Sequence, residues 1–564
     1  AENVHIGYKP AAELTTASGT VYIGQETAEQ RQTGNENIAL GTQALYGDST
    51  PANNTGGCNI ALGYHAGHDV TSGGNNVFIG KDAGKGTTTT SNAIMIGQAT
   101  GENISGGSNI FIGCAAGQGT GTAADNDAAH NVAIGHEAGK TLTDGDRNIF
   151  LGRDAGSSVT TGCNNIYLGY FAGKYNAGTH CNIAIGLEAA HKMGDGSNNI
   201  SIGTNSGSQN GTAADNDAAN NISIGQNAGC SLTDGDNNTF MGNSAGKKTT
   251  TGASNVLIGQ NAGDAVTTGS NYIAIGNNAL SAEDTAGSGS IAIGCGALLT
   301  QNATTGNNIA IGWHSGCSVV DATENVFVGY MAGRGVTGGK NVTLGGMTLT
   351  SSTSGTCNTA IGQDAMRQNT GSQNAVVGSL AMWGAGDASE NAFLGQYAGY
   401  NITDGDKNVF VGRGTGSAVT TGCCNVLLGY DVDAAATSDK TFKIGIAANS
   451  WITGDSSFNT TVNTICASNF NSTSDIRLKT NIQPIGNPIG KVKQIEGVSF
   501  NWKKDDKPAL GVIADQVEKI LPELVHGNDT KTVNYNGLIG LLIEAVKEQQ
   551  TQIDDLKSRL YKSE

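Results

Sequence analysis

The sequence is poor in proline, in aromatic side chains and in charge. Only 6 of its 564 residues are Pro, aromatic residues make up 5% of the chain and charged residues 14%. The 85 Gly follow no Gly-X-Y period, so a collagen-like chain is excluded. The shortage of aromatic residues argues against an enzyme built around one large conventional core. No apolar run approaches the roughly 18 residues that a membrane helix needs, so we expect no membrane insertion.

The net charge of −17 belongs to one part of the chain. Residues 474–564 contain 13 basic and 13 acidic side chains, whereas residues 1–473 contain 18 basic and 35 acidic ones. The first part also contains 78 of the 85 Gly. We therefore expect two different kinds of protein joined near residue 474. An acidic first part is unsuited to binding phosphate groups, so nucleic acid is not expected as a partner.

A nine-residue motif recurs along residues 1 to about 445. Asn148–Gly156 shows its form, NIFLGRDAG, in which apolar residues alternate before a Gly. We call the first Gly of each unit the marker glycine. There are 26 of them at nearly constant spacing; three steps are longer, and two of these carry the same insert, as at Gly121–Ala129. One short strand and two turns every 17 residues or so predict a long β-solenoid of about 26 coils.

Asn stands four residues before the marker glycine in 21 of the 26 units. Stacked coils would place these side chains above one another, so that their amides bond from coil to coil. The alternative is that each Asn makes only a local turn. We expect each coil to enclose a thin core of Ile, Val, Leu and Ala, with Ile183 and Ile185 as examples of the alternating strand residues. Because such a coil is marginal alone, several chains are expected to associate side by side.

The repeat resembles the head repeats of trimeric autotransporter adhesins, which share the x-Ala-Ile-Gly-x-x-Ala pattern. Residues 1 to about 445 carry this resemblance. It implies a trimeric β-roll and therefore a homotrimer. We do not expect the membrane anchor of those adhesins, because the last residues of this sequence are charged and helix-forming.

Cysteines and acidic loops are the candidates for disulfide or metal chemistry. Cys58 and Cys181 share one phase of the repeat, and other Cys share two further phases, which indicates small-residue slots rather than disulfide pairs. We expect reduced, mostly buried thiols and assembly in a reducing cytoplasm. Loops of the form Thr-Asp-Gly-Asp-x-Asn, such as Thr143–Asn148, resemble part of a calcium loop but lack its closing Glu. We expect Asp-Gly turns there, with no metal and no cofactor.

From Ser474 the sequence changes to a different module. It reads SDIRLKTNI at Ser474–Ile482 and GVIADQVEKILPELV at Gly511–Val525, and it ends in a helix-forming stretch at Leu538–Leu560. Along all 91 residues it resembles the intramolecular chaperone domain of phage tail fibres and tailspikes, of the endosialidase type, which also occurs in some eukaryotic membrane-bound transcription factors. The resemblance implies a domain that trimerises, helps the upstream fibre to fold and then cuts itself off.

The resemblance also implies which residues make the cut. The scissile bond would be Thr473–Ser474, with Ser474 as nucleophile, Lys479 as general base and Asp475 orienting the Ser or the scissile amide. The Lys must be neutral to act, so its pKa has to fall through burial or through a nearby positive charge, which Arg477 is close enough in sequence to supply. We expect trimerisation to bring Ser and Lys together. The alternative is that these residues only cap a strand and a helix, and no turnover enzyme is expected in either case.

The last helix carries a heptad seam. Its members step by four and three along one face, with one polar residue among them: Leu538, Leu542, Ala545, Gln549, Ile553, Leu556 and Leu560. This spacing favours a trimeric coiled coil. The alternative is an amphipathic helix that packs only on its own domain.

The sequence thus predicts a mainly β, trimeric fibre with a small α+β domain at its end. Its parts are a β-solenoid shaft at 1–430, a distal tip or linker at 431–473 and the chaperone domain at 474–564. The leading interpretation is a phage or prophage tail fibre of the virion, assembled in the host cytoplasm. Other tail proteins would join its N-terminal end, where Ala1 opens mid-pattern and is expected to be a cut end of something longer.

The expected function is recognition of a glycan or protein receptor on the host cell surface. Four aromatic residues gather near the tip, and aromatic platforms suit glycan binding: Phe442, Trp451, Phe458 and Phe470. They are the candidate receptor residues, although they would also fit a plug at the end of the solenoid. The alternative functions are a structural fibre or spacer, or a cellular trimeric adhesin without its own receptor site.

Overall fold

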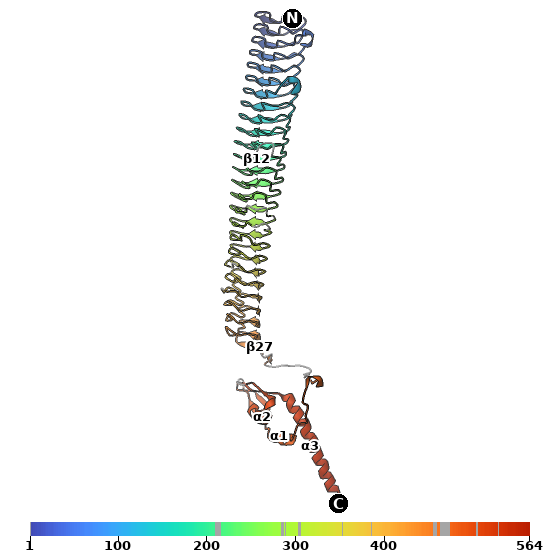
Figure 1. Cartoon of the computed structure of the whole chain (residues 1–564), viewed down its shortest axis with the longest axis vertical. Helices are drawn as coiled ribbons and strands as arrows, with labels where there is room; N and C mark the ends of the chain where they lie inside the picture. Colours follow the sequence, from blue (N-terminus) through green and yellow to red (C-terminus); the bar gives the residue numbers. More distant parts are fainter. Residues whose placement is uncertain are drawn as a thin grey trace. The chain divides into compact units, whose positions relative to one another are not determined.

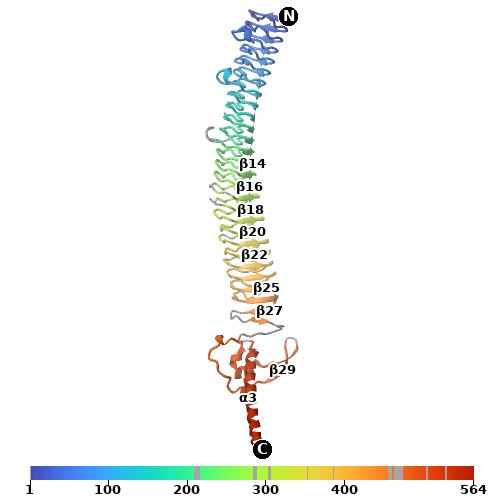
Figure 2. The same cartoon turned by 90° about the vertical axis from the view of Figure 1, so that its right-hand side faces the viewer.

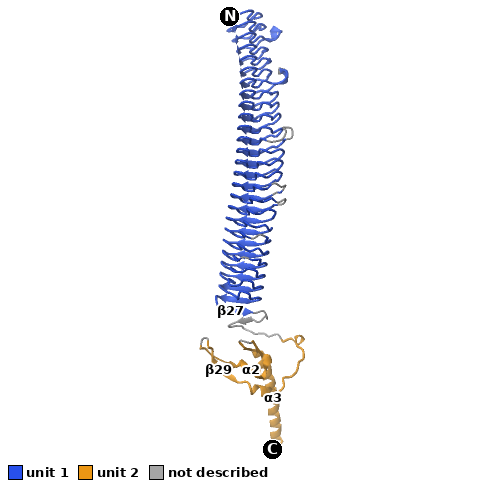
Figure 3. Cartoon of the chain, turned by 60° about the vertical axis from the view of Figure 1, so that its left-hand side comes forward, with its two compact units in different colours: residues 1–464 blue, residues 465–564 orange. Residues whose placement is uncertain are grey.

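The computed structural model describes the chain except for residues 1, 209–215, 284–286, 288, 303–305, 352–353, 385, 455–459, 463–473, 504–505, 528–529 and 564. Two compact units are present, Ala1–Thr464 and Ile465–Glu564 (Figure 3). Over its described residues the first unit is β apart from short 3-10 turns, and the second contains the helices.

The first unit is a parallel β-solenoid with one short strand in each repeat (Figures 1 and 2). Consecutive strands pair in parallel at the same phase, so that Ile166 lies beside Ile149 on one side and Ile183 on the other. The strands are β1 (Val4–Ile6), β2 (Val21–Ile23), β3 (Ile38–Leu40), β4 (Ile60–Leu62), β5 (Val77–Ile79), β6 (Ile94–Ile96), β7 (Ile110–Ile112), β8 (Val132–Ile134), β9 (Ile149–Leu151), β10 (Ile166–Leu168), β11 (Ile183–Ile185), β12 (Ile200–Ile202), β13 (Ile222–Ile224), β14 (Thr239–Met241), β15 (Val256–Ile258), β16 (Ile273–Ile275), β17 (Ile291–Ile293), β18 (Ile309–Ile311), β19 (Val326–Val328), β20 (Val342–Leu344), β21 (Thr359–Ile361), β22 (Ala375–Val377), β23 (Ala392–Leu394), β24 (Val409–Val411), β25 (Val426–Tyr430) and β26 (Phe442–Ile446). The predicted solenoid is confirmed, with one parallel strand for each marker glycine.

The longer repeats leave the strand register unchanged. Ile110 pairs with Val132 across one of the three longer steps, and the extra residues form a loop that contains the 3-10 turn η2 (Ala123–Asp125). A similar 3-10 turn, η1 (Pro51–Asn53), lies in the long step between β3 and β4. Inserts are therefore accommodated outside the sheet.

The marker glycine is required by both conformation and space. Gly152 has φ of +134°, where residues with a side chain are strained, and a Cβ there would lie 2.5 Å from the carbonyl oxygen of Gly169 in the next coil. Equivalent contacts recur between successive marker glycines along the shaft. Close stacking of the coils thus depends on a residue without a side chain at this phase.

The middle residue of each strand forms the core. Phe150, Tyr167 and Ala184 are fully buried, whereas Ile183 and Ile185 on either side of Ala184 face outward and are half-buried. The expectation that these Ile fill the interior was wrong. Strand residues alternate between the two faces of the sheet, and the inward face belongs to the middle position, which in turn packs on buried Ala such as Ala155.

The predicted Asn ladder is confirmed. Asn165 Nδ2 donates to Asn148 Oδ1 at 3.0 Å and to the carbonyl of Thr179 at 2.7 Å, while Asn165 Oδ1 accepts from the backbone N–H of Asn182 at 3.0 Å. The same side-chain bond links Asn148 to Asn131, Asn238 to Asn221 and Asn425 to Asn408, and these amides are almost completely buried. The ladder satisfies buried polar groups that the thin coil could not hydrate.

Parallel stacking ends after β26. β27 (Asn449–Gly454) pairs antiparallel with β26, and β28 (Thr460–Val462) pairs antiparallel with β27. A hairpin thus follows the last coil and changes the direction of the chain.

The second unit is a small α+β domain. Its elements are η4 (Ile476–Leu478), α1 (Pro488–Val492), β29 (Gly497–Asn501), β30 (Pro508–Val512), α2 (Ala514–Ile520), η5 (Pro522–Leu524), β31 (Val525–His526), β32 (Thr532–Val533) and α3 (Tyr535–Tyr561). Val517, Leu521 and Leu541 form its buried core. Lys531 forms ion pairs with Asp515 and Glu518, both at 2.6 Å, which fix the start of β32 to α2. Within the described ranges, no helix combines the length and the apolar character needed to cross a membrane.

Candidate functional site

Ser474 and Lys479 lie in contact at the start of the second unit. Between them the chain makes the single 3-10 turn η4, whose N-cap is Asp475. This turn brings the amine of Lys479 back to Ser474, with 2.7 Å between Nζ and Oγ. A lysine amine at hydrogen-bond distance from a serine hydroxyl is the geometry that a Ser–Lys pair needs once the amine is neutral. Thr473, on the other side of the expected scissile bond, lies outside the described residues.

Asp475 and Arg477 form an ion pair with each other. The backbone N–H of Arg477 donates to Asp475 Oδ1 at 2.9 Å, and its guanidinium donates to the same carboxylate at 2.6 Å. The Arg477 side chain lowers the pKa of Asp475 below its usual value. The charge of Arg477 is thus directed at a carboxylate.

Exposed apolar side chains stand near the Ser–Lys pair in the sequence, beside the Asp475–Arg477 ion pair. Both Ser474 and Lys479 are exposed, and Ile476, Leu478 and Ile482 nearby are between 59% and 74% exposed. Ser474 and Lys479 are thus already in contact within one chain.

The heptad seam of α3 is mostly exposed. Ala545 is buried in its own domain, whereas Leu542, one turn before it, is 50% exposed. Further along, Ile553, Leu556 and Leu560 are between 44% and 68% exposed, and with Tyr561 they line a shallow apolar hollow. The exposed part of the seam is free to pair with other copies of the helix.

Two of the four candidate receptor residues can be placed. Phe442 lies in β26 and is half-buried, and Trp451 lies in β27 and is 55% exposed. Phe458 and Phe470 lie outside the described residues. The role of these four residues in receptor binding stays a prediction.

The outward face of the shaft sheet is a surface that sequence reasoning missed. The first and third residues of each strand from β2 to β25 point away from the core, and all of them are apolar except Thr239 and Thr359. We call these two rows the apolar sheet face. Several members are strongly exposed, such as Leu151 at 47% and Leu394 at 52%. The ladder Asn gives the signal that would predict this face. Side chains alternate between the two faces along a strand, so the residue directly after a buried Asn points outward.

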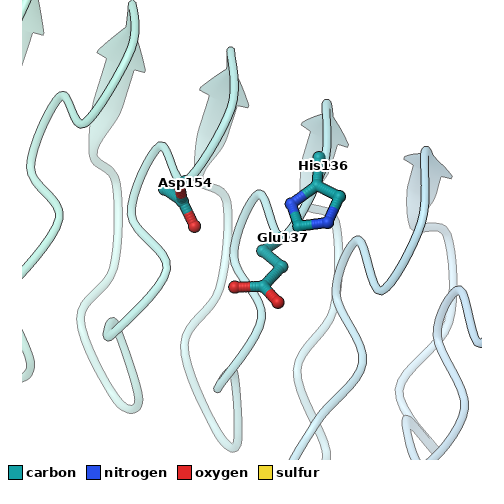
Figure 4. Close-up of side chains that lie close together, drawn as sticks. All are labelled: His136, Glu137 and Asp154. Atoms are coloured by element: carbon teal, nitrogen blue, oxygen red, sulfur yellow. The ribbon is translucent and has the colours of Figure 1, made fainter.

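One cluster on the shaft has the composition of a metal site. His136 and Glu137 come from one coil and Asp154 from the next, with ligand atoms within 4.8 Å of one another (Figure 4). Both carboxylates already have cations beside them: Lys140 lies 2.9 Å from Glu137 and Arg153 lies 3.3 Å from Asp154. The Lys140 hydrogen bond lowers the pKa of Glu137. Ion pairing within each coil accounts for the cluster.

The acidic loops serve the stacking of the coils. The second Asp of each Thr-Asp-Gly-Asp loop accepts a backbone N–H from the preceding coil, as Asp146 Oδ1 does from Ala129 at 2.8 Å. This agrees with the expected Asp-Gly turns.

The cysteines stand mostly on the outside of the coil. The ten cysteines that the structure describes are all free thiols, but only Cys317 among them is buried. The expectation of mostly buried thiols was therefore wrong. Cys58, Cys181, Cys357 and Cys424, which share the phase before the ladder Asn, are all exposed.

Comparison with known proteins finds similarity in the second unit. Residues 474–526 match the protein family described as chaperone of endosialidase. Over 98 residues the chain is 35% identical to the long tail fiber protein Gp37 of Enterobacteria phage K3, which is 15% of this chain and 8% of that protein. Over 103 residues it is 32% identical to Gp37 of Salmonella phage S16, which is 16% of this chain and 14% of the relative. No solved structure matches the chain.

These similarities confirm the chaperone module that the sequence predicts. They cover less than a fifth of either tail-fibre relative. Homology to long tail fibre proteins, the chaperone module and the β-solenoid together support a tail fibre that carries a C-terminal chaperone domain.

Proposed function

We propose that this chain is part of a phage tail fibre in which three copies form one shaft, and in which the C-terminal chaperone assembles the shaft and then removes itself. The shaft extends toward the host and binds its surface. The observation that carries this proposal is the union of a 26-coil solenoid, whose apolar sheet face is uncovered, with a module of the endosialidase chaperone family.

The apolar sheet face supports association between copies of the chain. At about 4.8 Å per coil the face from β2 to β25 is roughly 110 Å long, and with two residues across it presents on the order of 800 Å² of apolar surface. A monomer rarely leaves so large a patch in water, and the area is that of one side of a standard interface. None of its positions carries a charge, so the acidic side chains of the shaft do not repel one another across this face. Only a second copy offers a partner surface with the same repeat along its whole length.

The chaperone supplies the register that a periodic face lacks. Two identical rows of aliphatic residues attract equally well when shifted by one coil, and pairing over a long sequence separation is slow and prone to misassembly. The exposed seam of α3 holds three chains together at one end. Stacking that proceeds from that end begins in the correct register.

Self-cleavage follows from assembly. The Ser474–Lys479 contact exists in one chain, but the pair is exposed, and water stabilises the charged form of an amine. When neighbouring copies cover Ile476, Leu478 and Ile482, the amine is desolvated and its neutral form is favoured. Ser474 Oγ then attacks the carbonyl carbon of Thr473 while Lys479 takes the hydroxyl proton and passes it to the leaving Ser474 nitrogen, which converts the Thr473–Ser474 peptide bond into an ester on the Ser474 side chain. Water then hydrolyses this ester, which frees the Thr473 carboxylate and leaves Ser474 with a free amine and hydroxyl. Cleavage thus marks a completed trimer and leaves the shaft kinetically trapped.

Charged substitutions in the apolar sheet face test the trimer. The double variant Ile183→Lys, Ile185→Lys is expected to sediment as a monomer, because burying two ammonium groups costs more than the local apolar contact provides. Gln260→Lys, at an exposed position beside the sheet, is the matched control and should sediment as the trimer. If both variants sediment as wild type, this face is not the interface. Chains that end at Thr473 from the start should aggregate or stay monomeric, and soluble trimers from them would contradict the chaperone role.

Mass spectrometry of the expressed chain tests the cleavage. Wild type should yield fragments of 473 and 91 residues. Ser474→Ala and Lys479→Ala should stay intact while still forming trimers, and Lys503→Ala, an exposed Lys of the same module, should cleave normally. A Lys479→Ala protein that cleaves at the wild-type rate would remove Lys479 from the mechanism. An intact wild-type trimer after long incubation would remove the reaction.

A further inference from the structure

Some positions of the coil are left free by the fold. The residue directly after the marker glycine differs from one coil to the next, as in Gln98, Cys114, His136, Arg153 and Tyr170. The positions two and five residues after it vary in the same way, whereas the ladder and marker positions are nearly uniform. Large aromatic residues at the free positions are therefore not explained by the needs of stacking.

Aromatic residues at these free positions gather on the shaft in the coils of β22 to β25. Trp383 stacks on Tyr400, with ring centroids 5.4 Å apart and planes 8° apart, and Tyr397 meets Tyr400 edge-on at 5.6 Å. Arg413 lies over the rings of Tyr397 and Tyr430 at 5.9 and 5.4 Å. In a chain with 5% aromatic residues, four rings and one guanidinium thus form one strip across four coils. We call Trp383, Tyr397, Tyr400, Arg413, Tyr430 and Asp431 the lateral aromatic strip.

The strip borders a hollow whose other walls are polar. A cavity of about 330 Å³ is lined by Tyr397, Tyr400, Arg413 and Asp431, together with Asn401, Gly414 and Ser417. Its volume falls within the range of small-molecule sites. Among the described residues, no aliphatic side chain lines it. Arg413 donates to the Tyr430 hydroxyl at 2.9 Å and lies 3.7 Å from Asp431, so the positive charge is balanced locally.

We propose that the lateral aromatic strip is a binding site for a surface oligosaccharide, which rests on the proposed tail-fibre function and specifies its ligand. A sugar ring presents C–H groups on its faces and hydroxyls around its edge. The tyrosine and tryptophan faces pack against the C–H groups of the sugar. Its hydroxyls find hydrogen-bond donors and acceptors in the Asn401 amide, the Ser417 hydroxyl and the Arg413–Asp431 pair. A balanced charge favours a neutral sugar over a strongly anionic one, and the lack of aliphatic lining among the described residues favours a saccharide over an apolar protein anchor.

The coil repeat allows test variants that keep the fold. Asn261 and Ser157 occupy, in other coils, the positions of Tyr397 and Tyr400. The double variant Tyr397→Asn, Tyr400→Ser therefore removes two rings with residues that the coil already accepts. Trp313 and Tyr330 stack with centroids 5.2 Å and planes 8° apart at other coils. The variant Trp313→Gln, Tyr330→Gln, with the residue found at Gln260, is the matched control.

Binding is measured on the full chain with an array of immobilised neutral bacterial surface oligosaccharides, and with intact bacteria in parallel. We expect wild type to bind at least one oligosaccharide and the Tyr397→Asn, Tyr400→Ser variant to bind it about tenfold more weakly or not at all. The control variant should bind as wild type does. Titration of the same sugar should change the fluorescence of Trp383, and a Trp383→Phe variant should lose that signal.

The outcomes separate this inference from the proposed function. Wild type that adheres to bacteria but binds no oligosaccharide, or whose adhesion ends after protease treatment of the cells, overturns the saccharide site and leaves the tail-fibre function standing. Equal binding by wild type and by the Tyr397→Asn, Tyr400→Ser variant also overturns it, as does equal loss in the control. Wild type that adheres to no bacterium tested, while still binding a sugar through this strip, counts against host recognition and supports the site.

Discussion

Removal of one ladder amide is the sharpest test of how the shaft is held together. In Asn165→Ala the side chain loses its bonds to Asn148 Oδ1, to the Thr179 carbonyl and from the Asn182 N–H. The last two groups keep no other hydrogen bond among the described residues and lie in the dry interior. At about 1 to 3 kcal/mol for each buried group left unsatisfied, the coil should lose about 3 kcal/mol of stability.

The loss should be local, because each coil contacts only its neighbours. Hydrogen exchange followed by mass spectrometry reads it directly: amides of β10 and β11 should exchange roughly a hundredfold faster, since about 1.4 kcal/mol corresponds to a factor of ten. Amides of β20, far along the shaft, should be unchanged. Asn243→Ala is the control, because Asn243 is exposed and its side chain donates one bond, to Gln226 at 3.2 Å.

The reasoning fails if Asn165→Ala speeds exchange no more than Asn243→Ala does. The ladder would then be a by-product of the repeat, and backbone pairing alone would hold the coils. A uniform increase along the whole shaft would contradict the other premise, that stability is a sum over neighbouring coils.

Two further predictions concern single positions of the shaft. Gly152→Ala should lower the melting temperature strongly, at a cost of about 3 kcal/mol or more, because its Cβ would collide with the next coil and the residue has φ of +134°; Gly346→Ala, where a Cβ meets nothing within 4 Å, should be nearly neutral in the same thermal melt. Asp264 has an oxygen that is buried without a partner among the described residues, and burial raises its pKa. A raised pKa in the folded state means that the stability this group contributes is present below its ordinary pKa and is lost as pH rises through the folded value. Asp264→Asn should therefore be more stable than wild type at pH 7 and should match wild type at pH 3. A gain of the same size at both pH values would refute the assignment to the carboxylate.

The architecture of the shaft could be read from the sequence because it depends on a period. Marker glycines and ladder Asn recur at fixed phases, and a fixed phase in a stacked fold means a fixed place in space. The face that each strand residue occupies does not follow from hydrophobicity, which predicts a core of Ile, Val, Leu and Ala although Ile183 and Ile185 lie on the outward face. The alternation of side chains along the strand determines which residues form the core. Because Asn182 is buried, Ile183 points outward and Ala184 points inward.

The candidate sites were predictable to different degrees. The Ser474–Lys479 pair follows from one turn of local chain, so a short stretch of sequence was enough to suggest the contact. The lateral aromatic strip joins Trp383, Tyr397, Arg413 and Tyr430 from four coils, and only counting each residue from its marker glycine brings them together. The heptad spacing of α3 can be recognised in the sequence. Which of its residues pack on their own domain depends on the core around Leu541, which the spacing alone does not predict.

The strand register is the same whether the step between two coils has the usual or the longer length, and this has a consequence for inheritance. Ile110 pairs with Val132 in the same way as Ile149 pairs with Ile166, because the pairing depends on the phase of each strand in its repeat and not on the length of the loop between them. A genetic crossover between any two repeats at the same phase therefore joins two halves of a sound coil. Shafts can lengthen, shorten or exchange surface residues by recombination without passing through an unfolded intermediate sequence. The stacking rule that builds the shaft therefore also allows its length and its surface residues to change.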